Sequence, residues 1–277
     1  MKIYSSKYRI NLGIFESLKI FFCEIKSHKK YIFSTIYNDI IAKYKQDKLG
    51  LLWTIILPIV PMSIYILLAT IKAFKSSEYM PHIFYISVGM TIWLLISEIM
   101  VITMKSIKKN KTTLLKSNFP FSVIYISSLG ELILNIFIRI CLVIFIMFYF
   151  SIKINLINIL LFILFLIPIL LFAFSSGIIL SFLDTYIPDT KRLLDMFLRY
   201  GLFLSSVIFP FPIDGLLGEL NRFNIFNTFI VSSREILYCG YTKLLDLYII
   251  YTLFSIVLFL FAIQLALRLE FRVRAYL

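Results

Sequence analysis

The sequence predicts an all-α integral membrane protein with six membrane-spanning helices, an N-terminal interfacial amphipathic helix and a re-entrant segment before the last span. Two features of composition predict this class: 60% of the 277 residues are hydrophobic and only 16% are charged. Soluble domains carry about 25% charged residues, so these charges are too few to cover a water-soluble globule. The third observation is a series of apolar stretches of about 20 residues, the length that a helix needs to cross a bilayer.

Charge and motif patterns exclude several classes of protein. The net charge of +13 is spread over the segments between the apolar stretches, so we expect a membrane protein and no nucleic-acid partner. The three cysteines, at positions 23, 141 and 239, and the two histidines, His28 and His82, form no metal-ligand or catalytic spacing. We therefore expect no bound metal and no catalytic residue.

Residues 1–49 are expected to form a cytoplasmic region ahead of the transmembrane domain, residues 50–277. From Tyr31 to Tyr44 apolar residues recur at steps of one and three, which is typical of an amphipathic helix. Lysines follow this stripe, so we expect the helix to lie in the membrane interface among anionic headgroups. The stretch Ile14–Ile25 has a similar stripe. Two roles are compatible with such helices: a membrane anchor, or a surface that docks a partner.

Hydropathy windows of about 19 residues place the six spans. They are Leu51–Thr70, Ile83–Met104, Ser122–Phe150, Leu156–Phe182, Leu193–Ile213 and Leu245–Leu267. The fifth span is interrupted by charged residues, glycine and proline, and the segment after it, about 214–240, is half polar. Broken backbone is tolerated at membrane depth only under protein or beside water, which predicts a re-entrant pair of short helices there.

Lysine and arginine predict the orientation. Most of them fall in residues 1–49, 105–116 and 184–200 and in the C-terminal tail, which lie on one side of the predicted membrane. Basic residues favour the cytoplasmic side, so both termini are expected to be cytoplasmic. The loop KSIKKNKTTLLKSNFP, residues 105–120, is then either a basic loop of ordinary topology or a short helix presented to a cytosolic subunit.

One face of the third span is polar. Glu131, Asn135 and Arg139 recur at steps of four, and charges at membrane depth need partners, for which Glu98 and Gln264 are candidates. The face either fixes the bundle through hydrogen bonds between helices or lines a polar path. The sequence contains no GxxxxGK[ST] phosphate-binding loop, so we do not expect this chain to hydrolyse ATP.

Four stretches resemble the permease subunits of type-2 ABC exporters for polysaccharides. They are DIIAKYKQDKLGLLWTIILP at 39–58, LLKSNFP at 114–120, YIPDTKRLLDMFLRYGLFLSSVIFP at 186–210 and FNIFNTFIVSSREILYCG at 223–240. The last stretch departs from the family in having Asn-Ile where an Asn-Pro pair is usual. The resemblance implies a homodimer in the bacterial cytoplasmic (inner) membrane that binds two copies of a separate ATPase subunit, on which ATP and Mg²⁺ act. It also implies a lipid-linked glycan as cargo, of the lipopolysaccharide O-antigen, capsule or teichoic-acid type.

The resemblance also implies sites. The ATPase-subunit interface would comprise Lys108, Lys109, Asn110, Lys111, Leu114, Leu115 and Lys116, with Tyr37 and Lys43 of the interfacial helix. An aromatic-lined translocation path would include Trp53, Tyr65, Trp93, Phe203 and Phe209, to which the spacing argument adds Glu131, Asn135 and Arg139. The re-entrant segment would contribute Asn224 and Arg234.

Two other functions remain open from sequence. A permease for a drug or a small lipid would have the same architecture, because a fold does not determine its cargo. A membrane-embedded glycosyl or acyl transferase would need a catalytic acid or histidine, and none is well placed.

Overall fold

The computed structural model describes residues 12–46, 80–117, 119–152, 155–210 and 223–276, with isolated positions at 56, 59–60, 63–64, 67, 218 and 221. Within these residues the protein is all-helical and has no strand. Four helical segments there are long and apolar enough to cross a membrane: His82–Lys109, Phe121–Tyr149, Leu156–Tyr186 and Leu245–Tyr276. At this level the structure confirms four of the six predicted spans. The predicted span Leu51–Thr70 lies, apart from isolated positions, outside the described residues.

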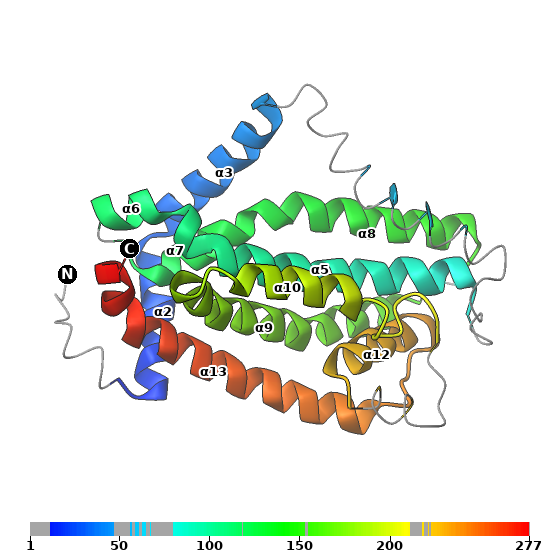
Figure 1. The fold of residues 1–277 in the computed structure, drawn as a ribbon. Helices are drawn as coiled ribbons and strands as arrows, with labels where there is room; N and C mark the ends of the chain where they lie inside the picture. The colour runs from blue at the N-terminus through cyan, green and yellow to red at the C-terminus, as the bar shows by residue number, and fades with distance from the viewer. Residues whose placement is uncertain are drawn as a thin grey trace.

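Three long helices form the centre of the bundle. Helix α9 (Leu156–Tyr186) packs between α5 (His82–Lys109) and α13 (Leu245–Tyr276), as Figure 1 shows. A Cβ placed on Gly177 of α9 would lie 2.6 Å from the Cβ of Thr103 in α5. Small residues let membrane helices approach closely and replace the hydrophobic driving force that lipid does not supply.

The predicted third span is not one uninterrupted helix. It consists of α7 (Phe121–Ser128), the 3-10 turn η1 (Leu129–Glu131) and α8 (Leu132–Tyr149). A Cβ on Gly130 in η1 would lie 2.3 Å from Cγ1 of Ile36. The absence of a side chain at Gly130 therefore makes room for another helix to cross the turn. That helix is α3 (Lys29–Gln46), which follows α2 (Ile14–Ser27). Both N-terminal stretches that were predicted to be helical are therefore helices.

The fifth predicted span differs most from expectation. Helix α10 (Thr190–Gly201) has 12 residues, a length of about 18 Å, and turns follow it to residue 209. The hydrocarbon core is about 30 Å thick, so α10 is too short to cross it. The carbonyls after α10 accept side-chain donors instead of continuing a helix: Leu204 accepts from Asn224, and Ser206 accepts from Tyr85. The described part of the predicted span Leu193–Ile213 is therefore not one continuous helix, because α10 ends at Gly201 and turns follow it.

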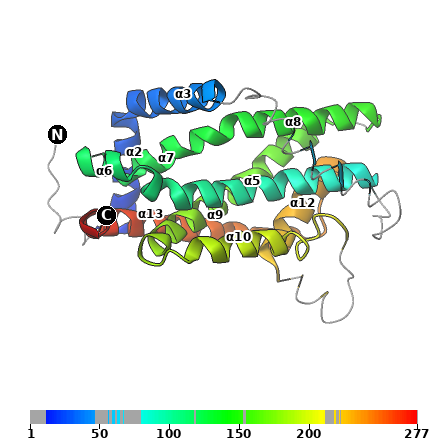
Figure 2. The ribbon, with the colours of Figure 1, turned by 45° about the horizontal axis from the view of Figure 1, so that its top comes forward.

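Of the segment predicted to contain a re-entrant pair of helices, about 214–240, the structure describes residues 218, 221 and 223–240. Residues 225–239 form one helix, α12 (Ile225–Cys239), which ends at Gly240 with φ +81°. It packs against α5, α9 and α13. Residues 211–217, 219–220 and 222 lie outside the described residues. Figures 1 and 2 agree that α12 lies at one end of the bundle and α6 (Lys111–Lys116) at the other.

Candidate docking surface at the basic end of the bundle

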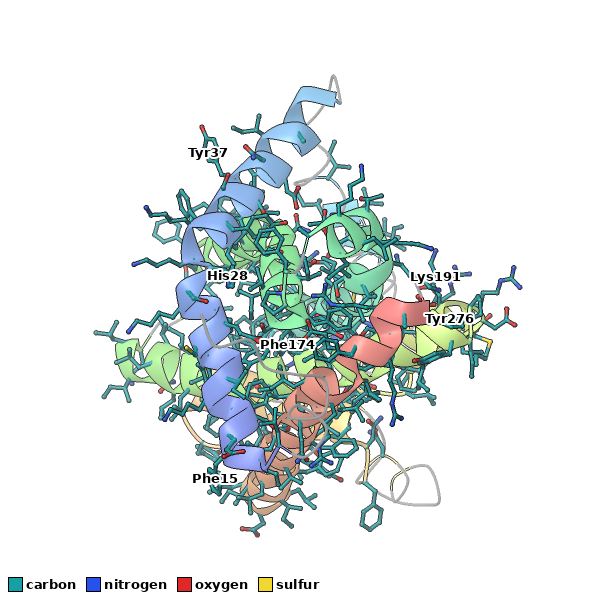
Figure 3. All side chains as sticks on the ribbon, turned by 90° about the vertical axis from the view of Figure 1, so that its left-hand side faces the viewer. Phe15, His28, Tyr37, Phe174, Lys191 and Tyr276 are labelled. Carbon is teal, nitrogen blue, oxygen red and sulfur yellow. The ribbon has the colours of Figure 1, made fainter. Side chains whose placement is uncertain are left out.

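Segments far apart in sequence meet at the end of the bundle that we call the basic end. It comprises α2, α6, the α9–α10 connection (187–189) and the last turns of α13 (268–276) (Figure 1). Figure 3 looks onto this end and shows α2 and the end of α13 crossing it, with Lys191 and Tyr276 far from Tyr37. The aromatic rings of Tyr186 and Tyr276, 4.9 Å apart, join α9 to α13 there. Each of the four stretches that the sequence marks as rich in lysine and arginine (1–49, 105–116, 184–200 and the C-terminal tail) therefore has a described part at this end.

Helix α6 lies at the surface of this end. Its two leucines face in opposite directions: Leu114 is 2% exposed and Leu115 is 55% exposed. Lys111 and Lys116 at its two ends are exposed as well. Helix α6 thus presents one apolar side chain between cations, while Leu114 anchors it to the core.

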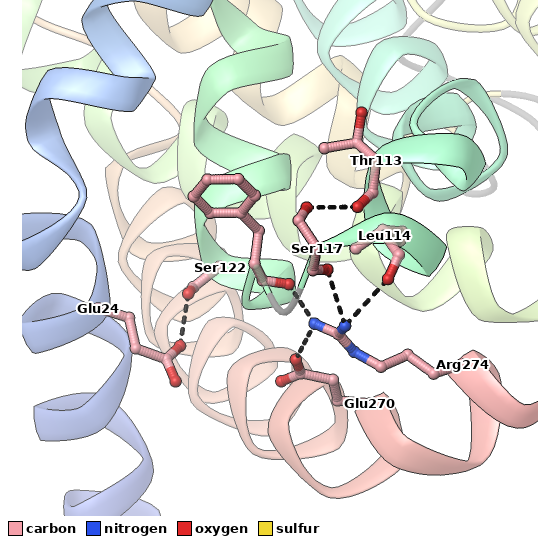
Figure 4. A network of polar contacts seen from close by, with 8 residues as sticks. Glu24, Thr113, Leu114, Ser117, Ser122, Glu270 and Arg274 are labelled. Carbon is pink, nitrogen blue, oxygen red and sulfur yellow. Dashed lines mark hydrogen bonds and ion pairs between the residues drawn. The ribbon is translucent and has the colours of Figure 1, made fainter. Parts of the chain in front are cut away.

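Arg274 in the last turn of α13 holds the C-terminal side of α6 (Figure 4). Its Nη1 donates to the carbonyls of Leu114, at 3.1 Å, and Ser117, at 3.4 Å, and its Nη2 donates to the carbonyl of Phe119. Nη2 also pairs with Glu270 Oε1 at 2.8 Å, one turn earlier in α13. The last carbonyls of a helix have no partners within it, and a cation favours that end of the helix dipole. One guanidinium therefore satisfies several acceptors of the α6–α7 connection.

The opposite side of the connection is held by the N-terminal helices. Ser122 at the start of α7 donates its hydroxyl to Glu24 of α2. The ring of Tyr31 in α3 stacks on Phe119 with centroids 4.0 Å apart, and His28 meets the same ring at 5.6 Å. The connection between α6 and α7 is thus fixed by both ends of the chain.

A third contact joins α5 to α9 beside α6. Lys108 Nζ lies 2.8 Å from Asp184 Oδ2, and the aspartate side chain is 3% exposed. Asn110, another residue of the predicted interface, donates through Nδ2 to the carbonyl of Ser106 at 2.9 Å. Lys108 and Asn110 therefore shape the base of α6, whereas Lys111, Leu115 and Lys116 face outward.

The two interface residues predicted on the interfacial helix are less close to α6. Tyr37 is exposed on α3, on the side of Figure 3 away from Lys191. The side chain of Lys43 lies outside the described residues. The apolar stripe of α3 divides: Ile32 is buried, and Phe33 and Tyr37 are exposed. The exposed half is a surface for lipid or protein.

Among the described residues, those predicted for a translocation path lie in different surroundings. Trp53 and Tyr65 lie outside the described residues, and so does the side chain of Glu131. Trp93 is 2% exposed and packs on Phe226 in the core. Phe203 is exposed and Phe209 is half-buried, and both follow α10.

The polar face of the third span has found a partner on α5. Arg139 is buried and donates to both carboxylate oxygens of Glu98, through Nη1 at 3.0 Å and through Nη2. Asn135 Nδ2 lies 3.4 Å from the same carboxylate. Of the two partners suggested by the sequence, the structure selects Glu98, while Gln264 donates to the carbonyl of Leu12. This cluster attaches α8 to α5, the helix of the described bundle against which it packs.

Asn224 and Arg234 have structural roles at the α12 end. Asn224 caps α12, with Oδ1 accepting from the amides of Phe226 at 3.0 Å and Asn227 at 3.4 Å. Arg234 is 1% exposed and lies over the Tyr85 ring, with Cζ 3.5 Å from the centroid, and donates to the carbonyl of Ser206. Both residues therefore hold the turns that follow α10.

Sequence reasoning missed four residues at or beside the basic end: Glu24, Asp184, Glu270 and Arg274. The spacing of Glu270 and Arg274, one helical turn apart, indicates a local ion pair. No sequence signal indicates that Arg274 reaches the carbonyls of residues 114–119. A scan against protein-family models finds no match to this chain, and a search of curated proteins finds no similar sequence.

Proposed function

We propose that this chain is the permease subunit of a type-2 ABC exporter that moves a lipid-linked polysaccharide across the bacterial cytoplasmic membrane. The observation that carries the proposal is α6. It is a short helix at the basic end that exposes Leu115 between Lys111 and Lys116 and is braced from α13. In this proposal a separate ATPase subunit docks at α6, and it is this subunit that binds Mg²⁺ and ATP and hydrolyses ATP. Two copies of the permease form a homodimer.

The orientation of the proposed exporter follows from charge. Lysine and arginine favour the cytoplasmic side of a membrane. The helices that meet at the basic end carry several of them: Lys19 and Lys26 in α2, Lys111 and Lys116 in α6, and Arg268, Arg272 and Arg274 in α13. We propose that this end faces the cytoplasm, with both termini, and that the α12 end faces outward. The six spans and the re-entrant segment belong to the same proposal.

The docking surface suggests the chemistry of the ATPase partner. Burying the leucine side chain in an apolar pocket would contribute about 1.5–3 kcal/mol to the free energy of association. We therefore expect the partner to offer an apolar pocket for Leu115. The lysines on either side require carboxylates around the rim of that pocket, since like charges would oppose association. The proposed partner surface is thus an acidic groove with an apolar floor.

Co-purification from native membranes in mild detergent tests the proposal. We expect the tagged chain to bring down an ATPase with a Walker motif, and Leu115→Asp to weaken that association by about tenfold or more, because a charge would enter the apolar pocket. Tyr241→Asp is the control, since Tyr241 is also exposed but lies at the α12 end. Failure of any such ATPase to associate would overturn the proposed function.

The cargo needs a separate measurement. In liposomes that contain the complex, we expect ATP-dependent movement of an undecaprenyl-linked glycan and stimulation of ATP hydrolysis by it. A complex that is stimulated by amphiphilic drugs and indifferent to the glycan would refute the polysaccharide assignment while retaining the exporter.

A further inference from the structure

We infer that Arg274, aligned by Glu270, is the positioning residue that couples α6 to α13, so that force applied at α6 moves the last transmembrane helix. The part of this inference that concerns force from a docked ATPase rests on the proposed function. The contacts that carry it are independent of that function. They join a surface helix to a helix that crosses the whole bundle.

The first step is that α6 cannot be stable alone. It has six residues, and isolated helices shorter than about 12 residues are marginal in water even with favourable sequences. Its internal support consists of backbone bonds such as Leu114 to the Asn110 carbonyl and Ser117 to the Thr113 carbonyl, each 2.9 Å. External contacts must therefore supply the remaining stability.

The second step is that Arg274 supplies these external contacts at the C-terminal end of α6, where backbone carbonyls need hydrogen-bond donors. Its guanidinium contacts three carbonyls, those of Leu114, Ser117 and Phe119, and its Cζ lies 5.6 Å from the Phe121 ring. Several rigid donors in one plane allow this arrangement, which a lysine ammonium on a flexible stem does not reproduce. The three carbonyls span the change of direction from α6 to α7.

The third step is that the base of Arg274 is itself rigid. Glu270 is 4% exposed and holds Nη2 at 2.8 Å, so the guanidinium has a defined orientation. Helix α13 has 32 residues in all, a length of about 48 Å, and it runs from the basic end to the α12 end with α9 lying along it. Because α13 is one continuous helix, a displacement of α6 would move α13 as a rigid body and would not be absorbed by a flexible loop.

Hydrogen exchange tests the clamp without any partner. In nanodiscs, we expect the amides of residues 111–117 to exchange at least about tenfold faster in Arg274→Gln, since the loss of even one hydrogen bond to a charged group costs about 1.5–3 kcal/mol. Arg272→Gln is the matched control, because it removes the same charge from an exposed position two residues away. Equal exchange in the two variants would overturn the clamp.

A charge swap separates the clamp from a simple ion pair. Glu270→Arg with Arg274→Glu restores opposite charges one turn apart, yet a carboxylate at 274 cannot donate to carbonyls. We expect no recovery of protection in the swap and partial recovery in Arg274→Lys. Full recovery in the swap would refute the role of the carbonyl contacts.

The coupling itself is measured with MgATP and the ATPase subunit that co-purifies. We expect Arg274→Gln to retain association of the subunit and to lose about tenfold in permease-dependent ATP hydrolysis, the factor of one charge-assisted hydrogen bond. Arg199→Gln, which removes the same charge from an exposed position on α10 outside the basic end, should hydrolyse ATP as wild type does. Normal hydrolysis in Arg274→Gln, with the ATPase bound, overturns the inference alone, whereas absence of the ATPase from wild type overturns the proposed function.

Discussion

Replacing Arg139 by leucine is the sharpest test of the polar cluster between α5 and α8. Arg139 donates two hydrogen bonds to Glu98, and the two side chains are 5% and 27% exposed. Removing the arginine leaves the carboxylate inside the apolar bundle without its cation, with only Asn135 near it. Breaking a buried pair in this way costs about 3–5 kcal/mol. Because Glu98 is partly exposed, we expect the lower part of that range, about 3 kcal/mol.

The double variant Glu98→Leu with Arg139→Leu supplies the comparison. It removes both charges, so no carboxylate is stranded, and apolar replacement of a buried pair is often neutral. We expect its unfolding free energy to lie within about 1 kcal/mol of wild type and the double-mutant cycle to give a coupling of about 2 kcal/mol or more. Unfolding is followed by tryptophan fluorescence during titration of mixed micelles with a denaturing detergent.

The same variants distinguish the two roles that the spacing of Glu131, Asn135 and Arg139 left open. If the cluster only attaches α8 to α5, the stable double variant transports at the wild-type rate. A stable but inactive double variant would instead assign Arg139 to a polar path. If Arg139→Leu and the double variant were equally stable, the unpaired charge of Glu98 would not be the cause of the lost stability.

Three further predictions concern packing and caps. Gly177→Leu should lower the thermal unfolding temperature, with a cost of about 1–3 kcal/mol from overpacking against Thr103, whereas an exposed leucine substitution elsewhere on α9 should not. Lys108→Met should destabilise by stranding the buried carboxylate of Asp184, and adding Asp184→Asn should restore most of the loss; no restoration would contradict the pairing. Asn224→Ala should cost about 1 kcal/mol by removing the N-cap of α12, seen as faster amide exchange at residues 226 and 227.

The predictability of the fold varies from helix to helix. Continuous apolar stretches such as Leu156–Phe182 need no partner to be helical in a bilayer, so the spans around α5, α8, α9 and α13 follow from hydropathy. Over Leu193–Ile213 the apolar composition suggests a span, yet the helix ends at Gly201. The competing donors are Tyr85, Asn224 and Arg234, which lie far away in sequence and bind the carbonyls that a longer helix would have used.

The candidate site shows the same division. A basic loop with two adjacent leucines is compatible with an ordinary cytoplasmic loop and with a docking segment, and periodicity places Glu131, Asn135 and Arg139 on one face. Neither pattern tells which leucine of α6 is buried, because that depends on where the loop meets α13. Nor does it identify Glu98 as the partner of Arg139, because the choice depends on how α5 and α8 are rotated against each other.

By itself the sequence determined that this protein is helical, apolar enough for a membrane and segregated in charge, since each of these properties follows from local composition and the period of a helix. Only the tertiary structure decided that α10 is short, that Leu115 faces outward and that Arg274 braces α6. These outcomes depend on hydrogen bonds between residues up to 160 positions apart, such as the one from Arg274 to the carbonyl of Leu114. Such bonds exist only once the helices have packed, because a carbonyl accepts whichever donor the packing brings to it.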